Sequence, residues 1–129
     1  MTRVLAAVAM IVATALHLYV FAHESILFTR PATQRMLEVE PQHAAAVRLW
    51  AFHQGVYNAL LAGAALVGAV ALLAGDEQLG LPLTLPAAVS MIAAAFALLV
   101  ADRRRARVPG FLAQALPAAI ALALLAVPV

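Results

Sequence analysis

The chain contains no cysteine and no lysine, and charged residues make up only 11% of its 129 residues. Without cysteine, disulfides, thiolate metal sites and cysteine nucleophiles are excluded. The formal net charge of +2 is too small to indicate nucleic-acid binding, so we expect no nucleic-acid partner.

Hydrophobic residues are abundant instead, at 66% of the chain, against about 45–50% in typical soluble domains. A soluble domain this small could not bury so much apolar surface, because short chains bury the smallest fraction of theirs. The composition therefore predicts one domain, residues 1–129, whose apolar side chains face a lipid bilayer.

Four apolar stretches are long enough to cross about 30 Å of hydrocarbon as helices, which takes roughly 20 residues. They cover residues 4–28, 45–73, 82–101 and 108–127. They lack the polar and apolar alternation of β-barrel strands. The sequence thus predicts an all-α integral membrane protein with four transmembrane helices packed as an up-down bundle. The first stretch starts like a signal peptide, but it continues to Phe28, so we expect it to be retained.

Arginines gather in two of the predicted loops. The loop near residues 29–45 contains Arg30 and Arg35, and the loop at residues 102–107 contains four more. The opposite side has only Arg3. The positive-inside rule then predicts that both loops are cytoplasmic and that both termini lie outside.

Ionisable residues inside a membrane span are costly and by default mark a functional site. His17 and Glu24 lie seven residues apart in the first span. This separation nearly closes two helical turns and puts both residues on one face. Tyr19 and His23 share a different face.

The second span contains two polar stripes. Gln54 and Asn58 are four residues apart and stack on one face, while His53 and Tyr57 form a neighbouring stripe. The fourth span contains Gln114. Such amides are also common as hydrogen bonds between membrane helices, each contributing about 0.6–2 kcal/mol.

Residue counts from the cytoplasmic ends of the first two spans give the depth of each polar side chain. By this count, Glu24 lies near Gln54, and His17 lies near Asn58. The pattern predicts a shared polar cavity between these spans, open toward the cytoplasm.

The polar residues fall in three motifs: His17-Leu18-Tyr19 followed by Glu24, Gln54-Gly55-Val56-Tyr57-Asn58, and Gln114 with Leu116-Pro117-Ala118. Their combination resembles a family of small four-span bacterial membrane proteins, domain of unknown function 1304. The resemblance covers spans one, two and four. It implies the four-span fold and a multi-pass protein of the bacterial inner membrane, but no known activity.

Two positions depart from the family pattern. The family often has glutamate where this chain has Leu16, and the absence of a second carboxylate weakens any mechanism that needs two. It often has asparagine where this chain has His53, which adds a candidate cofactor ligand here.

The first functional hypothesis is a polar pocket for a small lipophilic molecule, either a binding site or an acid–base enzyme of isomerase or hydratase type. The candidate catalytic residues are His17, Glu24 and Tyr57, because a histidine and a carboxylate suit proton transfer. The candidate substrate-binding residues are Tyr19, Gln54, Asn58 and Gln114.

Three other hypotheses remain open. The polar residues could serve assembly alone, with or without a homo-oligomer. A cofactor, haem or a divalent metal, could bind His17, His53 and Glu24, although no HxxxH or HExxH spacing occurs. A proton relay of His17 and Glu24 could support transport, although no inverted repeat is evident.

Overall fold

The computed structural model describes residues 1–127; residues 128–129, the end of the predicted domain, lie outside the described residues. In the described range all regular structure is helical. Four spans in this range are long and apolar enough to cross a membrane: Thr2–Ile26, Pro41–Leu73, Glu77–Ala101 and Arg105–Leu125. The predicted all-α membrane fold is confirmed.

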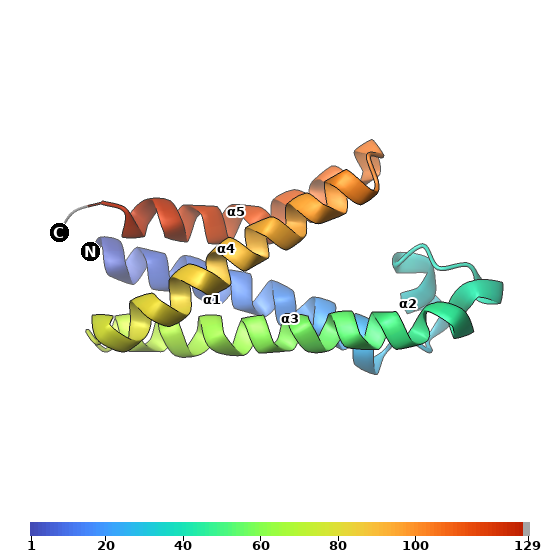
Figure 1. The fold of residues 1–129 in the computed structure, drawn as a ribbon, viewed down its shortest axis with the longest axis horizontal. Helices are drawn as coiled ribbons and strands as arrows, with labels where there is room; N and C mark the ends of the chain where they lie inside the picture. The colour runs from blue at the N-terminus through green and yellow to red at the C-terminus, as the bar shows by residue number, and fades with distance from the viewer. Residues whose placement is uncertain (128–129) are drawn as a thin grey trace.

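The helical elements follow one another in this order: α1 (Thr2–Phe21), the π-helix η1 (Ala22–Ile26), α2 (Pro31–Met36), the 3-10 helix η2 (Pro41–His43), α3 (Ala44–Leu73), α4 (Glu77–Ala101), the 3-10 helix η3 (Arg105–Arg107) and α5 (Val108–Leu125). Successive long helices run in opposite directions, and the start of α1 and the end of α5 lie at one end of the bundle (Figure 1). α1 packs against α3 and α5, and α4 packs against the same two helices. The four long helices therefore form the predicted up-down bundle.

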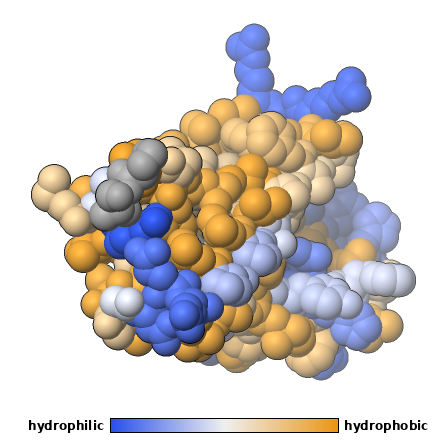
Figure 2. All heavy atoms as spheres, turned by 60° about the vertical axis from the view of Figure 1, so that its left-hand side comes forward, coloured by the Kyte–Doolittle hydropathy of each residue, from blue (hydrophilic) through white to orange (hydrophobic). Residues whose placement is uncertain are grey.

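Small side chains fill the interior of the bundle. Met10 and Met91 are fully buried there. Alanines from all four long helices surround them: Ala6, Ala7, Ala13, Ala65, Ala69, Ala87, Ala88, Ala118 and Ala121. Small residues let membrane helices approach closely, so dispersion contacts can replace the hydrophobic effect that is missing in lipid. Large hydrophobic side chains instead cover much of the outside (Figure 2).

α4 begins at Glu77, five residues before the predicted start at Pro82. The reason is a side-chain cap. Asp76 Oδ1 accepts a hydrogen bond of 3.0 Å from the backbone N–H of Leu79, which satisfies one of the free donors at the helix start. Pro82 therefore lies inside the helix, a position that membrane helices tolerate.

One ion pair and one hydrogen bond join the helices at the end of the bundle where α1 begins and α5 ends. Arg3 Nε lies 2.9 Å from Glu77 Oε1, and Arg3 Nη1 donates to the carbonyl of Leu125 at 2.9 Å. One arginine thus connects α1 to the start of α4 and the end of α5.

A second charged cluster joins the two arginine-containing loops at the other end. Glu38 Oε2 lies 2.6 Å from Arg104 Nη2 and 2.7 Å from Arg107 Nη2. Arg107 Nε also lies 2.7 Å from Asp102 Oδ2. Hydrogen bonds from Arg104 and Arg107 hold the pKa of the Asp102 carboxyl well below its usual range.

Candidate functional site

The first span ends in a π-helical turn that the sequence did not reveal. The backbone N–H of Leu27 donates to the carbonyl of Ala22 at 2.8 Å, a bond across five residues that widens the helix. Ser25, in this turn, donates from Oγ to the carbonyl of Phe52 on α3 at 3.0 Å. Single π-helical turns occur frequently at functional sites.

Glu24 lies in the same turn and is hydrogen-bonded to α3. Asn58 Nδ2 donates to Glu24 Oε2 at 3.0 Å and to the carbonyl of Gln54 at 3.1 Å. Asn58 is buried, and both N–H bonds of its amide are used. Over residues 1–127, no hydrogen bond from the protein reaches the second carboxylate oxygen of Glu24.

Gly55 allows the π-helical turn to lie directly against α3. A Cβ atom at Gly55 would overlap Ser25 Oγ and would lie 3.1 Å from Glu24 Cβ. Close approach of two backbones is a general use of glycine. Gly55 therefore brings Glu24 within reach of Asn58.

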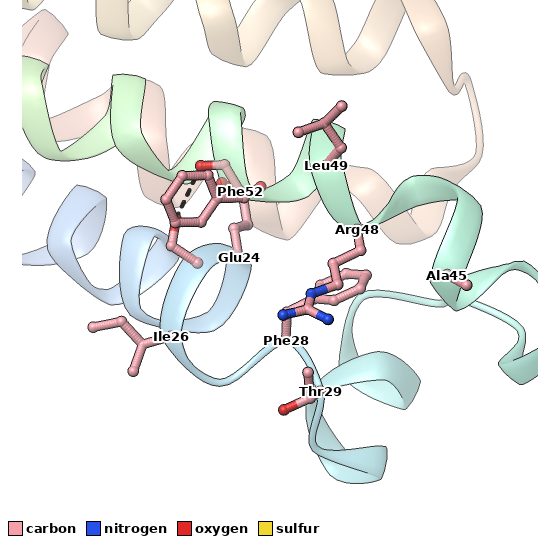
Figure 3. A pocket seen from close by; sticks show the side chains of 9 residues that line it. Glu24, Ile26, Phe28, Thr29, Ala45, Arg48, Leu49 and Phe52 are labelled. Carbon is pink, nitrogen blue, oxygen red and sulfur yellow. Dashed lines mark hydrogen bonds between the residues drawn. The ribbon is translucent and has the colours of Figure 1, made fainter.

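A cavity of about 500 Å³ opens beside Glu24. Its polar lining includes Ser25, Thr29 and Arg48, and apolar residues such as Phe52 complete the wall. Figure 3 shows the side chain of Arg48 extending from α3 toward Phe28 and Thr29, in the segment that follows the π-helical turn. The volume falls in the range of about 300–1,000 Å³ typical of small-molecule sites.

His17 is fully buried and lies outside the lining of this cavity. Its Nδ1 lies 2.9 Å from the carbonyl of Ala13. A carbonyl can only accept, so Nδ1 is the donor in this hydrogen bond. No partner for His17 Nε2 or for the nearby Thr14 Oγ1 occurs among the described residues.

The remaining predicted site residues lie away from the cavity. Tyr57 and Tyr19 are 63% and 54% exposed, and the tyrosine hydroxyl of Tyr19 donates to Met36 Sδ at 3.3 Å. Gln54 is exposed on α3 and contributes its backbone carbonyl to Asn58, not its side chain. Gln114 is half-buried on α5, which packs on α1 and α4.

The depth count placed Glu24 near Gln54, and in the structure the Cβ of Glu24 lies against Gly55, the next residue of α3. The hydrogen bond of Glu24 goes to Asn58, one helical turn further along α3, and not to the side chain of Gln54. The Asn58 amide reaches back to the level of Gln54, because helical side chains tilt toward the N-terminus of their helix, and it also donates to the Gln54 carbonyl. The expected nearness of His17 to Asn58 stays a prediction.

The candidate cofactor ligands are also separated. His53 is exposed on α3, whereas His17 is fully buried. Across the described part of the chain, no group of three or more His, Asp or Glu residues is close enough to hold a metal ion. A cofactor role for either histidine stays a prediction.

Sequence reasoning missed Ser25 as a polar contact between the first span and α3. The signal for Ser25 was its place next to Glu24, but a regular α-helix would turn it elsewhere. Gly55, four residues before Ala59 and eight before Gly63, has the small-residue spacing of close helix packing, but this spacing does not show that Gly55 meets Ser25. Nothing in the sequence marks the π-helical turn itself.

No curated protein and no solved structure matches the chain. A family model described as "Protein of unknown function (DUF1304)" matches residues 10–126, which include all four long helices in whole or in part. This match agrees with the resemblance of the polar motifs and carries no activity. The chain belongs to the DUF1304 family of membrane proteins of unknown function.

Proposed function

We propose that the cavity beside Glu24 binds a small lipophilic molecule through a polar group of that molecule. The observation that carries this proposal is the half-buried Glu24 carboxylate in the cavity wall, with one oxygen bonded to Asn58 and the other bonded by no residue within 1–127. A hydrogen-bond donor of a ligand would bond the second carboxylate oxygen of Glu24. The apolar residues of the lining would cover the rest of the ligand.

Within this proposal, Glu24 is the group best placed for acid–base chemistry on a bound molecule, because it alone among the predicted catalytic residues lines the cavity. Asn58 would fix the carboxyl group in one orientation, as a second residue does for most catalytic acids and bases. His17 is fully buried and does not line the cavity, so a direct contact with a ligand is not part of the proposal.

The test is a thermal-shift screen of the detergent-purified protein with lipophilic alcohols, ketones, epoxides and quinones. We expect at least one compound class to raise the melting temperature of the wild type but not of Glu24→Gln. Gln keeps an oxygen for Asn58, so this variant should still fold. Glu40→Gln, which alters an exposed loop carboxylate, is the matched control and should respond like the wild type. Stabilisation that persists in Glu24→Gln would reject Glu24 as the binding group.

Assembly without chemistry is the second candidate function, and one observation favours it. The bonds of Asn58 to Glu24 and of Ser25 to Phe52 both join the first span to α3, as interhelical bonds do in purely structural bundles. This alternative expects Glu24→Gln to change only the stability of the ligand-free protein. The same screen therefore separates the two functions.

We further propose that the protein resides in a bacterial inner membrane with both termini outside. The support is the arginine content of the two loops at the end of the bundle opposite the start of α1, because the positive-inside rule predicts that arginine-rich loops are cytoplasmic. The only arginine at the other side, Arg3, is paired with Glu77, which leaves it a weak competing signal. The cavity would then open near the cytoplasmic leaflet.

A further inference from the structure

The cavity beside Glu24 also contains an unpaired cation. Arg48 lines it from α3, with the guanidinium directed toward Phe28 and Thr29 (Figure 3). In residues 1–127, every ion pair of an arginine involves Arg3, Arg104 or Arg107, so no carboxylate of the described protein neutralises Arg48. One cavity thus contains a free guanidinium and a carboxylate with one free oxygen.

The cavity lies at the level where lipid headgroups are expected. Glu24 precedes Ile26, the last residue of the first span, by two residues, and Arg48 lies four residues into α3. Ile26 and Leu49 also line the cavity and are 64% and 61% exposed. Exposed apolar side chains beside a charged cavity at a span end suit a molecule with a polar head and acyl chains.

We infer that the cavity binds the headgroup of an aminophospholipid, with the lipid phosphate on Arg48 and the lipid ammonium on Glu24. The inference rests on the proposed function and names the chemical class of its ligand. A guanidinium presents a planar fork of donors that matches phosphate oxygens. A primary ammonium has N–H donors for the unbonded oxygen of Glu24. Only the headgroup enters, and the acyl chains lie along exposed residues such as Ile26 and Leu49.

Two common headgroups each lack one half of this complementarity. A choline headgroup contains a trimethylated nitrogen, which has no N–H to donate to Glu24. A glycerol headgroup has the phosphate but no cation. The structure therefore favours ethanolamine over choline and over glycerol. In this arrangement Glu24 provides the preference over glycerol, and Arg48 binds the phosphate that all three headgroups share.

The test is native mass spectrometry of the delipidated protein with equimolar phosphatidylethanolamine, phosphatidylcholine and phosphatidylglycerol of identical acyl chains. We expect the first bound lipid to be phosphatidylethanolamine, with about tenfold higher affinity than the others, the size of one charged hydrogen bond. Equal binding of the three lipids, or tighter binding of either competitor, would overturn the inference.

Variants assign the two contacts. Glu24→Gln should abolish the preference of ethanolamine over glycerol while glycerol lipid still binds. Arg48→Gln should weaken both lipids by a similar factor. Arg35→Gln, an exposed arginine outside the cavity lining, is the control and should bind like the wild type. An unchanged ethanolamine preference in both cavity variants would also overturn the inference, because the lipid would then bind elsewhere.

The two proposals fail in distinguishable ways. If small lipophilic compounds stabilise the protein through Glu24 but the three lipids bind equally, only the aminophospholipid is rejected. If the compounds act independently of Glu24 and the lipids bind equally, the cavity is no binding site of either kind.

Discussion

A carboxylate within a membrane span needs a hydrogen-bond partner, because an unpaired polar group in hydrocarbon costs several kcal/mol. Asn58 is that partner for Glu24, at 3.0 Å from the adjacent helix. The amide is itself fixed by the carbonyl of Gln54. The pair therefore serves two purposes: it joins the first span to α3, and it holds one carboxylate oxygen while the other stays open to the cavity.

Loss of the Asn58 amide should therefore destabilise the protein. We expect Asn58→Ala to lower the free energy of unfolding by about 1–2 kcal/mol, because Glu24 loses its donor. The measurement is unfolding of the purified protein in mixed micelles of increasing denaturing detergent. His53→Ala on the same helix is the control, since His53 is exposed, and should change stability by less than about 0.5 kcal/mol. Equal losses in the two variants would show that Asn58 contributes no special bond.

His17 presents the opposite situation: its ring is fully buried, and its Nε2 has no hydrogen-bond partner among the described residues. Thr14 lies three residues earlier on the same face of α1, and both residues are buried. What could not be predicted is that the ring bonds the carbonyl of Ala13 in its own helix. A sequence gives the face of a helix but not the local bond that a side chain will choose.

At the scale of helices, the contact between the π-helical turn and α3 depends on the absence of a side chain at Gly55. The same helix contains Gly63, where a Cβ would meet nothing within 4 Å. These two glycines on α3 therefore allow a matched comparison: Gly55 packs against another segment, and Gly63 has free space around it.

We expect Gly55→Ala to destabilise the protein by about 1–3 kcal/mol, because the new methyl group overlaps Ser25 and crowds Glu24. Gly63→Ala should be neutral or stabilise the helix by up to about 1 kcal/mol, since alanine is the better helix former. Thermal unfolding of both variants measures the difference. A Gly55→Ala variant as stable as Gly63→Ala would contradict the close approach of the π-helical turn to α3.

The predictability of the elements follows from the physical terms that fix them. Membrane spans are set by the length of apolar stretches, so the existence and order of the four spans could be predicted. Helix ends depend on local caps, and the Asp76 bond to Leu79 moved the start of α4 ahead of Pro82. The π-helical turn depends on tertiary contacts of Glu24 and Ser25, which a sequence does not display.

The same reasoning separates what helical spacing reveals about the site from what it does not. Glu24 and Asn58 were predicted to face one cavity; they are bonded to each other, but of the two only Glu24 lines the cavity of the structure. Their direct bond was not predicted, because it depends on how the Asn58 side chain turns back along α3 toward Gln54. Tyr57 belongs to a stripe next to Asn58, but that stripe faces outward and is exposed.

At the scale of the whole molecule, charged residues connect the loops at one end of the bundle. Glu38, from the first loop, pairs with Arg104 and Arg107, which also pair with Asp102. This cluster links the loop that precedes α3 to the loop between α4 and α5. Its dependence on pH follows from the lowered pKa of the Asp102 carboxyl.

A carboxyl group with a lowered pKa in the folded state stabilises that state above its unfolded pKa, and this contribution is lost as the pH falls toward the folded pKa. The melting temperature of the wild type should therefore exceed that of Asp102→Asn near neutral pH. The difference should shrink as the pH falls below about 4, where the unfolded carboxyl takes up its proton. Parallel pH profiles of the two proteins would contradict an ionic role for Asp102.

The proposed orientation can be tested with single cysteines, because the natural chain has none. In right-side-out vesicles, we expect a membrane-impermeant maleimide to label Thr2→Cys at once. Ala106→Cys, in the arginine-rich loop, should be labelled only after the vesicles are opened. The reverse pattern would place the arginine-rich loops outside, and the cavity with them.

Binding beside Glu24 is tested most directly by reaction with a lipophilic carbodiimide, which modifies carboxyl groups accessible from lipid. We would treat membranes that contain the protein and follow each carboxyl group by peptide mass spectrometry. Glu24 should be modified ahead of the exposed loop residue Glu40, and a compound that stabilises the protein through Glu24 should slow this reaction alone. Modification of Glu24 no faster than of Glu40, or a rate unaffected by such a compound, would contradict a ligand cavity at Glu24.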